Sequence, residues 1–332
     1  MRHLSVAEYG QFLACKGDRL QVKDKDKVVL ETPLSRLRII TIAKQGVGIS
    51  SNLLLACASR GIRLFILDWR GVAVAALSGN HQHAIASIRS AQFKFIESPF
   101  AADLSAEIVI TKLRNQRAVL LYFSKYLKGK NEEYCDNLKS NAIRLANYCD
   151  EIKALNLRCL EQWREQLMGF EGTGAATYWK TLRSSGLAID SFKKRDGRGS
   201  SELFNQALNY GYTLLISYVW SALDNAGFEL YAGFFHQERG GKPSLVLDIM
   251  EEYRPWVVDR TVIAMRFTLA KHDTFDAKLK KQIASEIHQT MAKRYLYKGK
   301  RLRLESIIQR QAYTLAGLMV NQKKYKGYRF KW

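Results

Sequence analysis

The side chains best suited to chemistry lie in one stretch, Gly233 to Pro255. His236 ends an apolar run, a Gly-Gly-Lys-Pro turn follows, and the next segment carries Asp248 and Glu251. On a helix, residues three apart share a face, so Asp248 and Glu251 point the same way. One imidazole and two carboxylates held together suit Mg²⁺ or Mn²⁺, and the imidazole favours Mn²⁺. The stretch therefore predicts a divalent-metal site.

The elements that must position this site can be read from the same residues. Ser244 is expected to cap a helix that carries both carboxylates, and Pro255 is expected to fall beyond its end. A structural interpretation remains open for each group taken alone. The histidine can be hydrogen-bonded within the fold, and the two carboxylates can form a solvated helix face. The combination of histidine, turn and paired acids is what favours ligation.

A second acid lies in a segment of small residues, Gly169 to Trp179. Glu171 is expected near the start of a helix, where free N–H groups and the helix dipole favour an anion or a phosphate nearby. A capping role for this acid is the alternative. His81 and His83 form a pair without a nearby carboxylate or cysteine, so we interpret them as part of a linker.

Charge sets the class of partner. The 332 residues contain 52 Lys and Arg against 31 Asp and Glu, a formal net charge of +21. Such an excess points to a polyanion, either nucleic acid or an acidic membrane surface. Residues 289–332 hold twelve Lys and Arg and one acid, with aromatic residues between them. Basic side chains can neutralise phosphates and rings can stack on bases, although a solvated helix and a frayed tail would have the same composition.

The pattern of elements predicts an α+β fold. Strands are expected over 20–22, 28–30, 38–42, 62–67 and 72–77, with a charged hairpin tip at 23–27 and a helix over Ser50–Arg60 that is capped by Ser50 or Ser51 and ended by Gly61. Helical periodicity then dominates, over 106–126, 138–168, 202–226, 257–270 and 276–296. We predict a small N-terminal β-rich domain (1–80), a linker (81–90) and a larger all-α catalytic domain with a basic C-terminal tail (91–332).

Location in the cell follows from what the sequence lacks. The five cysteines contain no C-x-x-C pair, which argues against a disulfide framework and a zinc ribbon and predicts buried, reduced thiols. Leu203–Leu223 is long and uncharged but contains three amide side chains, so we expect a buried helix rather than a membrane span. The chain is therefore expected to be cytoplasmic.

Taken together, these segments resemble the CRISPR-associated spacer-acquisition integrases, the metal-dependent endonuclease family often called Cas-one. Gly169–Tyr178 matches the family's glutamate-containing segment. Asn205–Tyr212 matches a helix with an N-x-x-L-N-Y-G-Y pattern, and Gly233–Pro255 matches the histidine and the acids that follow it. The N-terminal strands fit the family's β domain as well. The resemblance covers most of the chain.

The resemblance implies a ligand set. Glu171, His236 and Glu251 would be catalytic and would hold Mg²⁺ or Mn²⁺, while Asp248 would support a ligand or occasionally bind the ion itself. The last acid of the family is often Asp, but here Glu251 is followed directly by Glu252. Which of these two reaches the metal stays open, and the spacing from Asp248 favours Glu251.

The resemblance also implies an activity and partners. The 3′-hydroxyl of a short foreign DNA fragment would attack a phosphodiester at the edge of a CRISPR repeat, and water would give nuclease activity at the same site. Double-stranded and branched DNA, a second copy of the chain bound through the β domain, and a small dimeric companion protein would be the partners. The residues expected to contact DNA are basic: Lys242, Arg254, Lys293, Arg294, Lys298, Lys300, Arg301 and Arg303. A non-catalytic nucleic-acid-binding protein, for DNA or RNA, is the alternative.

Overall fold

The N-terminal region consists of two small sheets. The computed structural model describes residues 3–25, 27–68, 71, 73–77, 85–159, 162–197, 199–236 and 240–331. One sheet has the strand order β1-β5-β7-β8 and the other β4-β3-β2-β6. Their bounds are β1 (His3–Val6), β2 (Gln11–Lys16), β3 (Arg19–Asp24), β4 (Lys27–Pro33), β5 (Ile39–Ile42), β6 (Gly48–Ile49), β7 (Arg63–Leu67) and β8 (Ala73–Leu77).

Local signals in this region have the expected outcomes. Strands β3 and β4 pair antiparallel around the charged tip, where Lys25 has a positive φ of 53°. Helix α1 (Ser51–Ser59) begins after Ser50, whose side chain accepts a hydrogen bond from the backbone N–H of Leu53, and Gly61 follows with φ +63°. The predicted strands, the cap and the terminating glycine are therefore confirmed.

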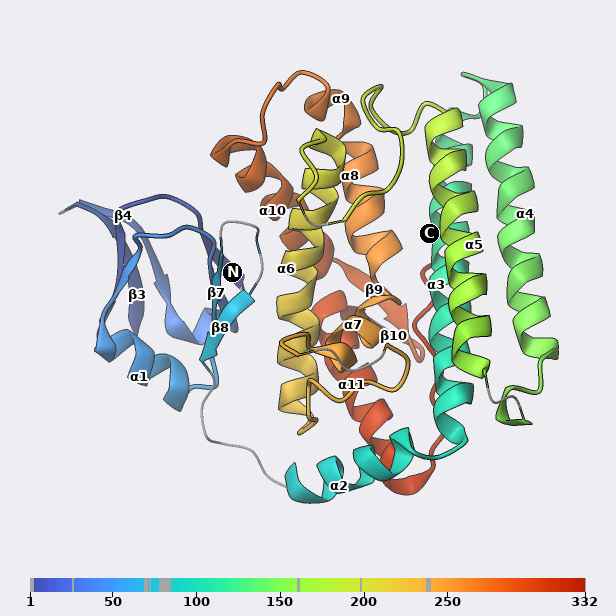
Figure 1. Cartoon of the computed structure of the whole chain (residues 1–332). Helices are drawn as coiled ribbons and strands as arrows, with labels where there is room; N and C mark the ends of the chain where they lie inside the picture. The colour runs from blue at the N-terminus through green and yellow to red at the C-terminus, as the bar shows by residue number, and fades with distance from the viewer. Residues whose placement is uncertain are drawn as a thin grey trace.

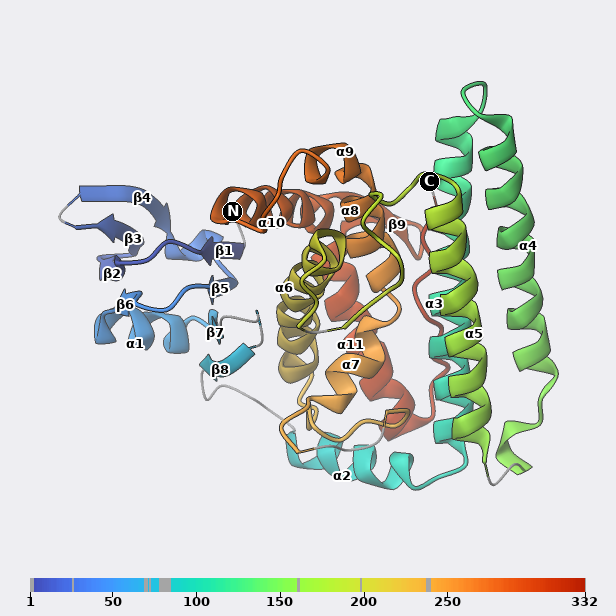
Figure 2. The ribbon, with the colours of Figure 1, turned by 45° about the horizontal axis from the view of Figure 1, so that its top comes forward.

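The rest of the chain is mostly helical. Its helices are α2 (Ile85–Ile96), α3 (Phe100–Leu127), α4 (Glu132–Ala154), α5 (Trp163–Ser184), α6 (Leu203–Asn225), α7 (Ser244–Met250), α8 (Arg260–Ala264), α9 (Arg266–Leu269), α10 (Ala277–Ala292) and α11 (Leu304–Asn321). Two short 3₁₀ turns, η1 (Leu34–Arg36) and η2 (Leu157–Cys159), and a π-helical turn, η3 (Pro255–Asp259), complete them. Figures 1 and 2 show α6 between the β region and the group formed by α3, α4 and α5.

Two boundaries differ from the sequence predictions. The periodic stretch 138–168 belongs to two helices, α4 and α5, because the chain turns back after Ala154. Helix α2 begins at Ile85, so residues 85–90 of the predicted linker are helical, and the pair His81 and His83 lies outside the described residues. We keep the domain division at 80 and 90 as a prediction.

The helical part also contains a hairpin that the all-α prediction misses. Strands β9 (Arg294–Tyr297) and β10 (Lys300–Arg303) pair antiparallel around Lys298 and Gly299, which have φ values of 47° and 81°. Two consecutive residues with positive φ are typical of a tight two-residue hairpin turn. A lysine in the first of these positions hid the turn signal in the sequence.

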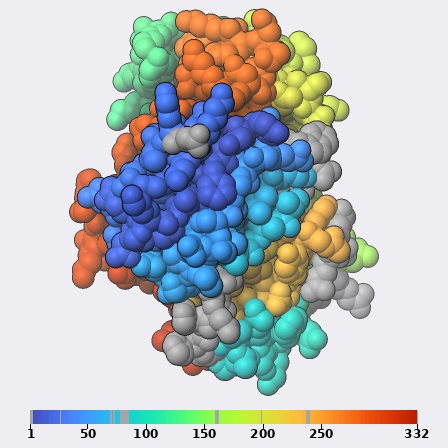
Figure 3. All heavy atoms as spheres, turned by 90° about the vertical axis from the view of Figure 1, so that its left-hand side faces the viewer, coloured from blue at the N-terminus to red at the C-terminus, as the bar shows by residue number. Residues whose placement is uncertain are grey.

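Two apolar cores hold the structure together. One is confined to the β region and the α1 helix, and the other fills the space among the helices and reaches Ile39, Phe65 and Leu67 of the first sheet. Buried Arg63 of β7 forms an ion pair with Asp224 and donates a 2.6 Å hydrogen bond to Asn225, both at the end of α6. Figure 3 shows the β region (blue) occupying the middle of one face of the molecule, above α2 (teal).

Helix α6 packs closely against its neighbours on several sides. A Cβ on Gly211 would lie 2.6 Å from Val258 Cγ1 and 3.1 Å from Ile287 Cδ1, so only glycine fits at this crossing. Asn205 and Asn209 bind Arg195 and the backbone of the loop before the helix. Within the described part of the chain, every helix is too short or too polar to cross a bilayer, and α6 is a buried helix as expected.

Candidate metal centre

Three predicted ligands come together from distant segments. Glu171 on α5, His236 in the loop after α6, and Glu251 just after α7 each offer a ligand atom, and these atoms lie within 4.8 Å of one another. The Glu251 side chain is 3% exposed and that of Glu171 is 16% exposed, so the carboxylates lie in a shielded position that remains open to solvent. The His236 side chain is about one-third exposed, at 32%.

Close packing of two helices brings Glu171 into the centre. Glu171 lies about two turns into α5, which begins at Trp163, so the expectation of a helix N-terminus at this acid is wrong. Instead, Gly174 one turn later lets α5 approach α3, because a Cβ there would lie 2.2 Å from Leu113 Cδ2. Gly174 therefore serves helix packing, whereas a Cβ on Gly169 or Gly172 would meet open space, and Glu171 faces Lys112 of the neighbouring helix.

Asp248 orients the histidine. Its Oδ2 accepts hydrogen bonds from the backbone N–H groups of Phe234 (2.8 Å) and Phe235 (3.0 Å). Its Oδ1 accepts from the His236 backbone N–H (3.0 Å) and lies 2.6 Å from His236 Nδ1. Burial would lower the pKa of His236, but the hydrogen bond and charge of Asp248 outweigh it and raise that pKa. Asp248 is fully buried with both oxygens engaged, so it holds the ring while Nε2 stays available.

The loop that ends at His236 can approach Asp248 closely because residue 233 is a glycine. A Cβ on this residue would lie 2.7 Å from Ser244 Cβ and 2.8 Å from Asp248 Oδ2. Ser244 itself is the first residue of α7 and its side chain caps nothing, so its predicted capping role is wrong. The backbone N–H groups of residues 234–236 donate to the Asp248 carboxylate, one turn inside the helix, and so tie the loop to α7.

The structure separates the two neighbouring glutamates. Glu251 faces Glu171 and His236, whereas Glu252 Oε1 accepts a hydrogen bond from the Tyr325 hydroxyl (2.6 Å) and Glu252 Oε2 from the Tyr328 N–H (3.0 Å). Burial raises the pKa of Glu252 to about 7. The helix breaks just beyond, at Pro255 and the π-helical turn, because proline cannot donate the next backbone bond.

Two cations lie against the carboxylates. Lys112 Nζ on α3 is 2.6 Å from Glu171 Oε1 and 2.6 Å from Glu251 Oε2, and Arg254 is 2.6 Å from Glu251 Oε1. Burial would raise the pKa of Glu251, but Arg254 and Lys112 outweigh it and hold that pKa below its usual range. Burial would lower the pKa of Lys112, but Glu171 and Glu251 raise it. Glu251 is therefore held as a carboxylate.

Lys112 is the site residue that the sequence reasoning missed. The only signal was a lysine following the apolar run Ile108-Val109-Ile110-Thr111 and preceding Leu113, where a helix that is buried over most of its surface would bury it too. A buried lysine needs an acidic partner. That signal gives no indication of which acids, because they lie 59 residues or more away along the chain.

The residues expected to contact DNA fall into two groups. Arg254 is engaged with Glu251, and its guanidinium lies 4.9 Å from the Tyr212 ring centroid. The other seven side chains are exposed: Lys242, Lys293, Arg294, Lys298, Lys300, Arg301 and Arg303. In the hairpin, Arg294 pairs directly opposite Arg303, which concentrates positive charge.

Four aromatic rings in and near the described C-terminal segment pack against one another. Trp256 stacks on Phe330 at 5.2 Å between ring centroids, and Tyr295 and Tyr328 both pack edge-on against Phe330. Tyr328 and Phe330 are 8% and 4% exposed. The expectation of rings stacking on bases is wrong for these residues, and the segment before residue 332 folds back onto the protein.

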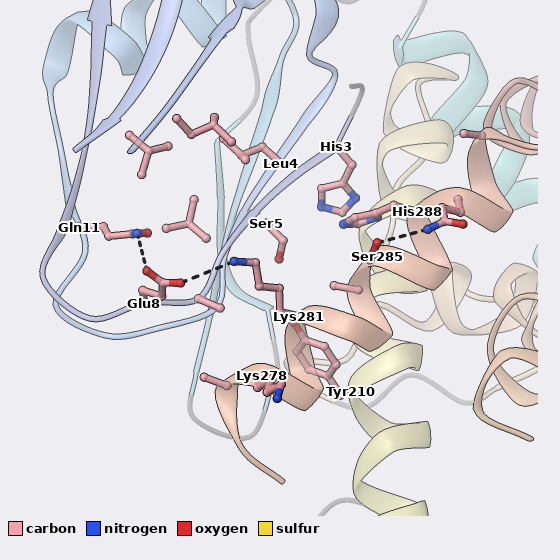
Figure 4. Close-up of a pocket in the computed structure, with 18 of the residues that line it drawn as sticks. His3, Leu4, Ser5, Glu8, Gln11, Tyr210, Lys278, Lys281, Ser285 and His288 are labelled. Atoms are coloured by element: carbon pink, nitrogen blue, oxygen red, sulfur yellow. Dashed lines mark hydrogen bonds and ion pairs between the residues drawn. The ribbon is translucent and has the colours of Figure 1, made fainter. Parts of the chain in front are cut away.

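A separate cavity lies away from this centre. It measures about 940 Å³ and separates strand β1 from α10 at the junction of the β region with the helices. Figure 4 shows His3 and His288 side by side at one end of it, and Glu8 near Lys281 at the other. Another group, Glu132, Cys135 and Asp136, has ligand atoms within 4.8 Å of one another, but Cys135 is buried and faces Ser124.

The donor set at Glu171, His236 and Glu251 fits Mg²⁺ or Mn²⁺. Ligands of an octahedral Mg²⁺ lie about 3.0 Å apart when adjacent and about 4.2 Å apart when opposite, so atoms within 4.8 Å of one another need to close by less than about 2 Å to share one ion. An ammonium group already lies between the two carboxylates, which shows that the position accepts a cation. Three protein ligands leave coordination positions for substrate oxygens.

Comparisons with known proteins show which family the chain resembles. A family model described as "CRISPR associated protein Cas1" matches residues 4–298. A Francisella tularensis subsp. novicida protein named CRISPR-associated endonuclease Cas1 1 is 45% identical over 332 residues, 100% of both chains. A casposase bound to integration product has a TM-score of 0.80 at 20% identity, covering 100% of this chain and 95% of that one. A chain of a Cas6-RT-Cas1–Cas2 complex has a TM-score of 0.78 at 22% identity, covering 99% and 36%.

Proposed function

Because the chain belongs to the Cas1 family of CRISPR-associated proteins, we propose that it is a divalent-metal-dependent DNA endonuclease and integrase. It would insert short DNA fragments into a CRISPR array by attack of a 3′-hydroxyl on a phosphodiester at the repeat edge. The observation that carries the proposal is the convergence of Glu171, His236 and Glu251, with ligand atoms within 4.8 Å of one another. A casposase that shares this fold has been solved bound to its integration product, which supports the proposal.

The residues around the centre have distinct roles in this proposal. Glu171, Glu251 and His236 Nε2 would bind the ion, and Asp248 keeps His236 in the orientation that leaves Nε2 free. A bound divalent ion neutralises charge on the attacked phosphate and stabilises the leaving oxygen. Arg254, buried against Glu251 and Tyr212, fixes the position of the Glu251 carboxylate. With water in place of the 3′-hydroxyl, the same site would cleave DNA.

Charge on the surface supports a DNA substrate. The exposed basic residues at the end of α10 and on the β9–β10 hairpin would neutralise phosphates, which makes binding strongly dependent on salt. We further propose that the protein acts as a homodimer together with a small dimeric companion protein. The likeness to a chain of a Cas6-RT-Cas1–Cas2 complex supports such an assembly.

Strand transfer by ligand variants tests the proposal. Glu171→Ala and His236→Ala should abolish transfer of a short DNA into a repeat-containing duplex in Mg²⁺ or Mn²⁺, while DNA affinity stays within a few-fold. Glu165→Ala is the matched control, because Glu165 is an exposed acid on the same helix. Chelator should stop the wild-type reaction. Unchanged transfer in both ligand variants would show that the protein binds nucleic acid without catalysing this reaction.

A further inference from the structure

Lys112 occupies the position that a bound cation would take. Its ammonium group contacts one oxygen of Glu171 and one of Glu251, each at 2.6 Å, and its side chain is 12% exposed. These are two of the three proposed ligands. No ammonium and divalent ion can share this space, because both require the same carboxylate oxygens at short range.

We propose that Lys112 is an internal counter-ion that holds Glu171 and Glu251 together in the metal-free protein, gives them up when a divalent cation binds, and then contacts a substrate phosphate. This inference rests on the proposed function. In the metal-free protein, Lys112 and Arg254 balance the charges of Glu171 and Glu251. Without Lys112, two carboxylates would face each other in a shielded site, which is costly.

Charge balance explains why the displaced lysine should meet DNA. In this structure Lys112 and Arg254 already balance the charges of Glu171 and Glu251, so a divalent ion adds two positive charges that these two acids do not offset. Only an anion can offset that excess in a partly buried position. A phosphodiester supplies one, so metal binding and DNA binding should strengthen each other, as reciprocal coupling requires.

Titration of the full-length protein with Mn²⁺ alone tests the first step. Lys112→Met should bind Mn²⁺ about tenfold or more tightly than the wild type, because the ion no longer has to break two charge-assisted hydrogen bonds. Lys112→Arg should stay close to the wild type, since a cation still lies between the acids. Lys153→Met is the control, because it removes an exposed lysine charge on α4 away from both groups of candidate ligands. Equal or weaker Mn²⁺ binding by Lys112→Met overturns the inference.

Two further measurements separate this inference from the proposed function. Glu171→Gln should remove Mn²⁺ binding; if it does not, the proposed metal site itself is wrong. If binding depends on Glu171 but Lys112→Met leaves it unchanged, the metal site stands and the role of Lys112 falls. Circular dichroism checks that each variant folds, and if Lys112→Met does not, Lys112→Gln with the same expected gain replaces it.

The second step is tested with DNA. Adding a short blunt duplex should tighten Mn²⁺ binding to the wild type more than to Lys112→Met, because the variant keeps the contact between the ion and a phosphate but lacks the contact of the lysine. In strand transfer, Lys112→Met should need less Mn²⁺ for half-maximal rate yet reach a maximal rate about tenfold lower, since one contact to a charged phosphate is lost. Lys112→Arg should restore the maximal rate in large part. A purely structural lysine would not change these two quantities in opposite directions.

Discussion

Glu251 and Glu252 are neighbours in the sequence, yet they serve two different regions of the molecule. Glu251 points toward Glu171 and His236, with Lys112 and Arg254 as its partners. Glu252 points to the opposite side and binds the C-terminal segment. Burial is nearly complete for both, at 2% and 0% exposure. What distinguishes a proposed metal ligand from a structural carboxylate is therefore the charge and hydrogen-bond donors around it.

The second region forms a clamp, which we define as Glu252, Asn115, Tyr325, Tyr328 and Phe330. Asn115 donates to the backbone carbonyls of Glu252 (2.7 Å) and Tyr328 (2.9 Å) and accepts from the Phe330 N–H (3.1 Å). The clamp fixes the backbone on which Glu251 is mounted. The comparison shows that two adjacent residues after α7 can have separate roles: Glu251 belongs to the proposed metal site, and Glu252 holds the C-terminal segment in place.

Replacing Glu251 or Glu252 by glutamine should give the largest difference between the two regions. Glu251→Gln should lower the strand-transfer rate by about 10³-fold or more, since the site loses a charged ligand worth several kcal/mol of transition-state stabilisation. Glu252→Gln should keep the rate within about tenfold, because the amide oxygen can still accept the hydrogen bond from the Tyr325 hydroxyl. Transfer rates at saturating Mn²⁺ give the measurement. Equal losses in the two variants would contradict the separation of the two regions.

Removing the support behind the histidine should have a smaller effect. Asp248→Asn replaces an oxygen that accepts from His236 Nδ1 with an amide, so the ring loses its fixed orientation. Changes of this kind cost about 10–100-fold in metal affinity or activity. Mn²⁺ affinity and transfer rate should fall together, and Asp273→Asn, an exposed acid elsewhere, serves as the control. Full Mn²⁺ affinity in Asp248→Asn would argue against His236 as a ligand.

The clamp should influence stability more than chemistry. Tyr325→Phe removes the hydroxyl that donates to Glu252 Oε1, which leaves a buried carboxylate oxygen with one donor fewer. We expect a loss of about 1–3 kcal/mol in the free energy of unfolding. Denaturant unfolding in the presence of chelator measures it, and Tyr313→Phe is the exposed control on α11. A larger effect on transfer rate than on stability would show that the two regions are not separate.

Low pH should destabilise the folded protein at a third region, the pair His3 and His288 between the β region and the helices. Burial lowers the pKa of His288 to about 4. The pKa of His3 is lowered mainly by burial and further by the nearby His288. The Tyr218 side chain contacts both rings. The unfolded chain binds protons at these groups below pH 6.5, while the folded protein does not. Stability from His288 is therefore complete above pH 6.5 and is lost as pH falls toward 4, by at most about 1.4 kcal/mol for each pH unit.

The measurement is the free energy of unfolding between pH 7.5 and 4.5 in chelator. His288→Gln should show a shallower decline than the wild type over this range. A parallel decline in both proteins would assign the acid sensitivity to other groups. Above pH 6.5 the contribution of these histidines to stability no longer changes with pH, so it does not affect a comparison of the Glu251 and Glu252 variants.

The sequence predicted those parts of the molecule that depend on local spacing. The hairpin tip at 23–27, the Ser50 cap and the family membership all rested on short patterns, and each is confirmed. The choice of Glu251 over Glu252 rested on the three-residue spacing from Asp248, and the observed geometry supports it as a proposal. Lys112 could not be placed, because its partners are set by how α3 and α5 pack at Gly174.

The structure of the C-terminal segment could not be predicted from its sequence. Its composition indicates either a basic nucleic-acid-binding tail or a frayed end, and both descriptions use only charge and ring content. The fold instead uses the rings for packing and Glu252 as an anchor, while Lys323 and Lys324 remain exposed. Tertiary contacts between residues more than 70 positions apart decide this, and no local pattern contains them.

Crystals of the protein soaked in Mn²⁺ would test the central claim most directly, through anomalous scattering from the bound ion. The account predicts one peak within about 2.2 Å of Glu171, His236 Nε2 and Glu251, with the Lys112 ammonium displaced from between the two carboxylates. An empty centre with Lys112 still in place, or a peak only at Glu132 and Asp136, would contradict it.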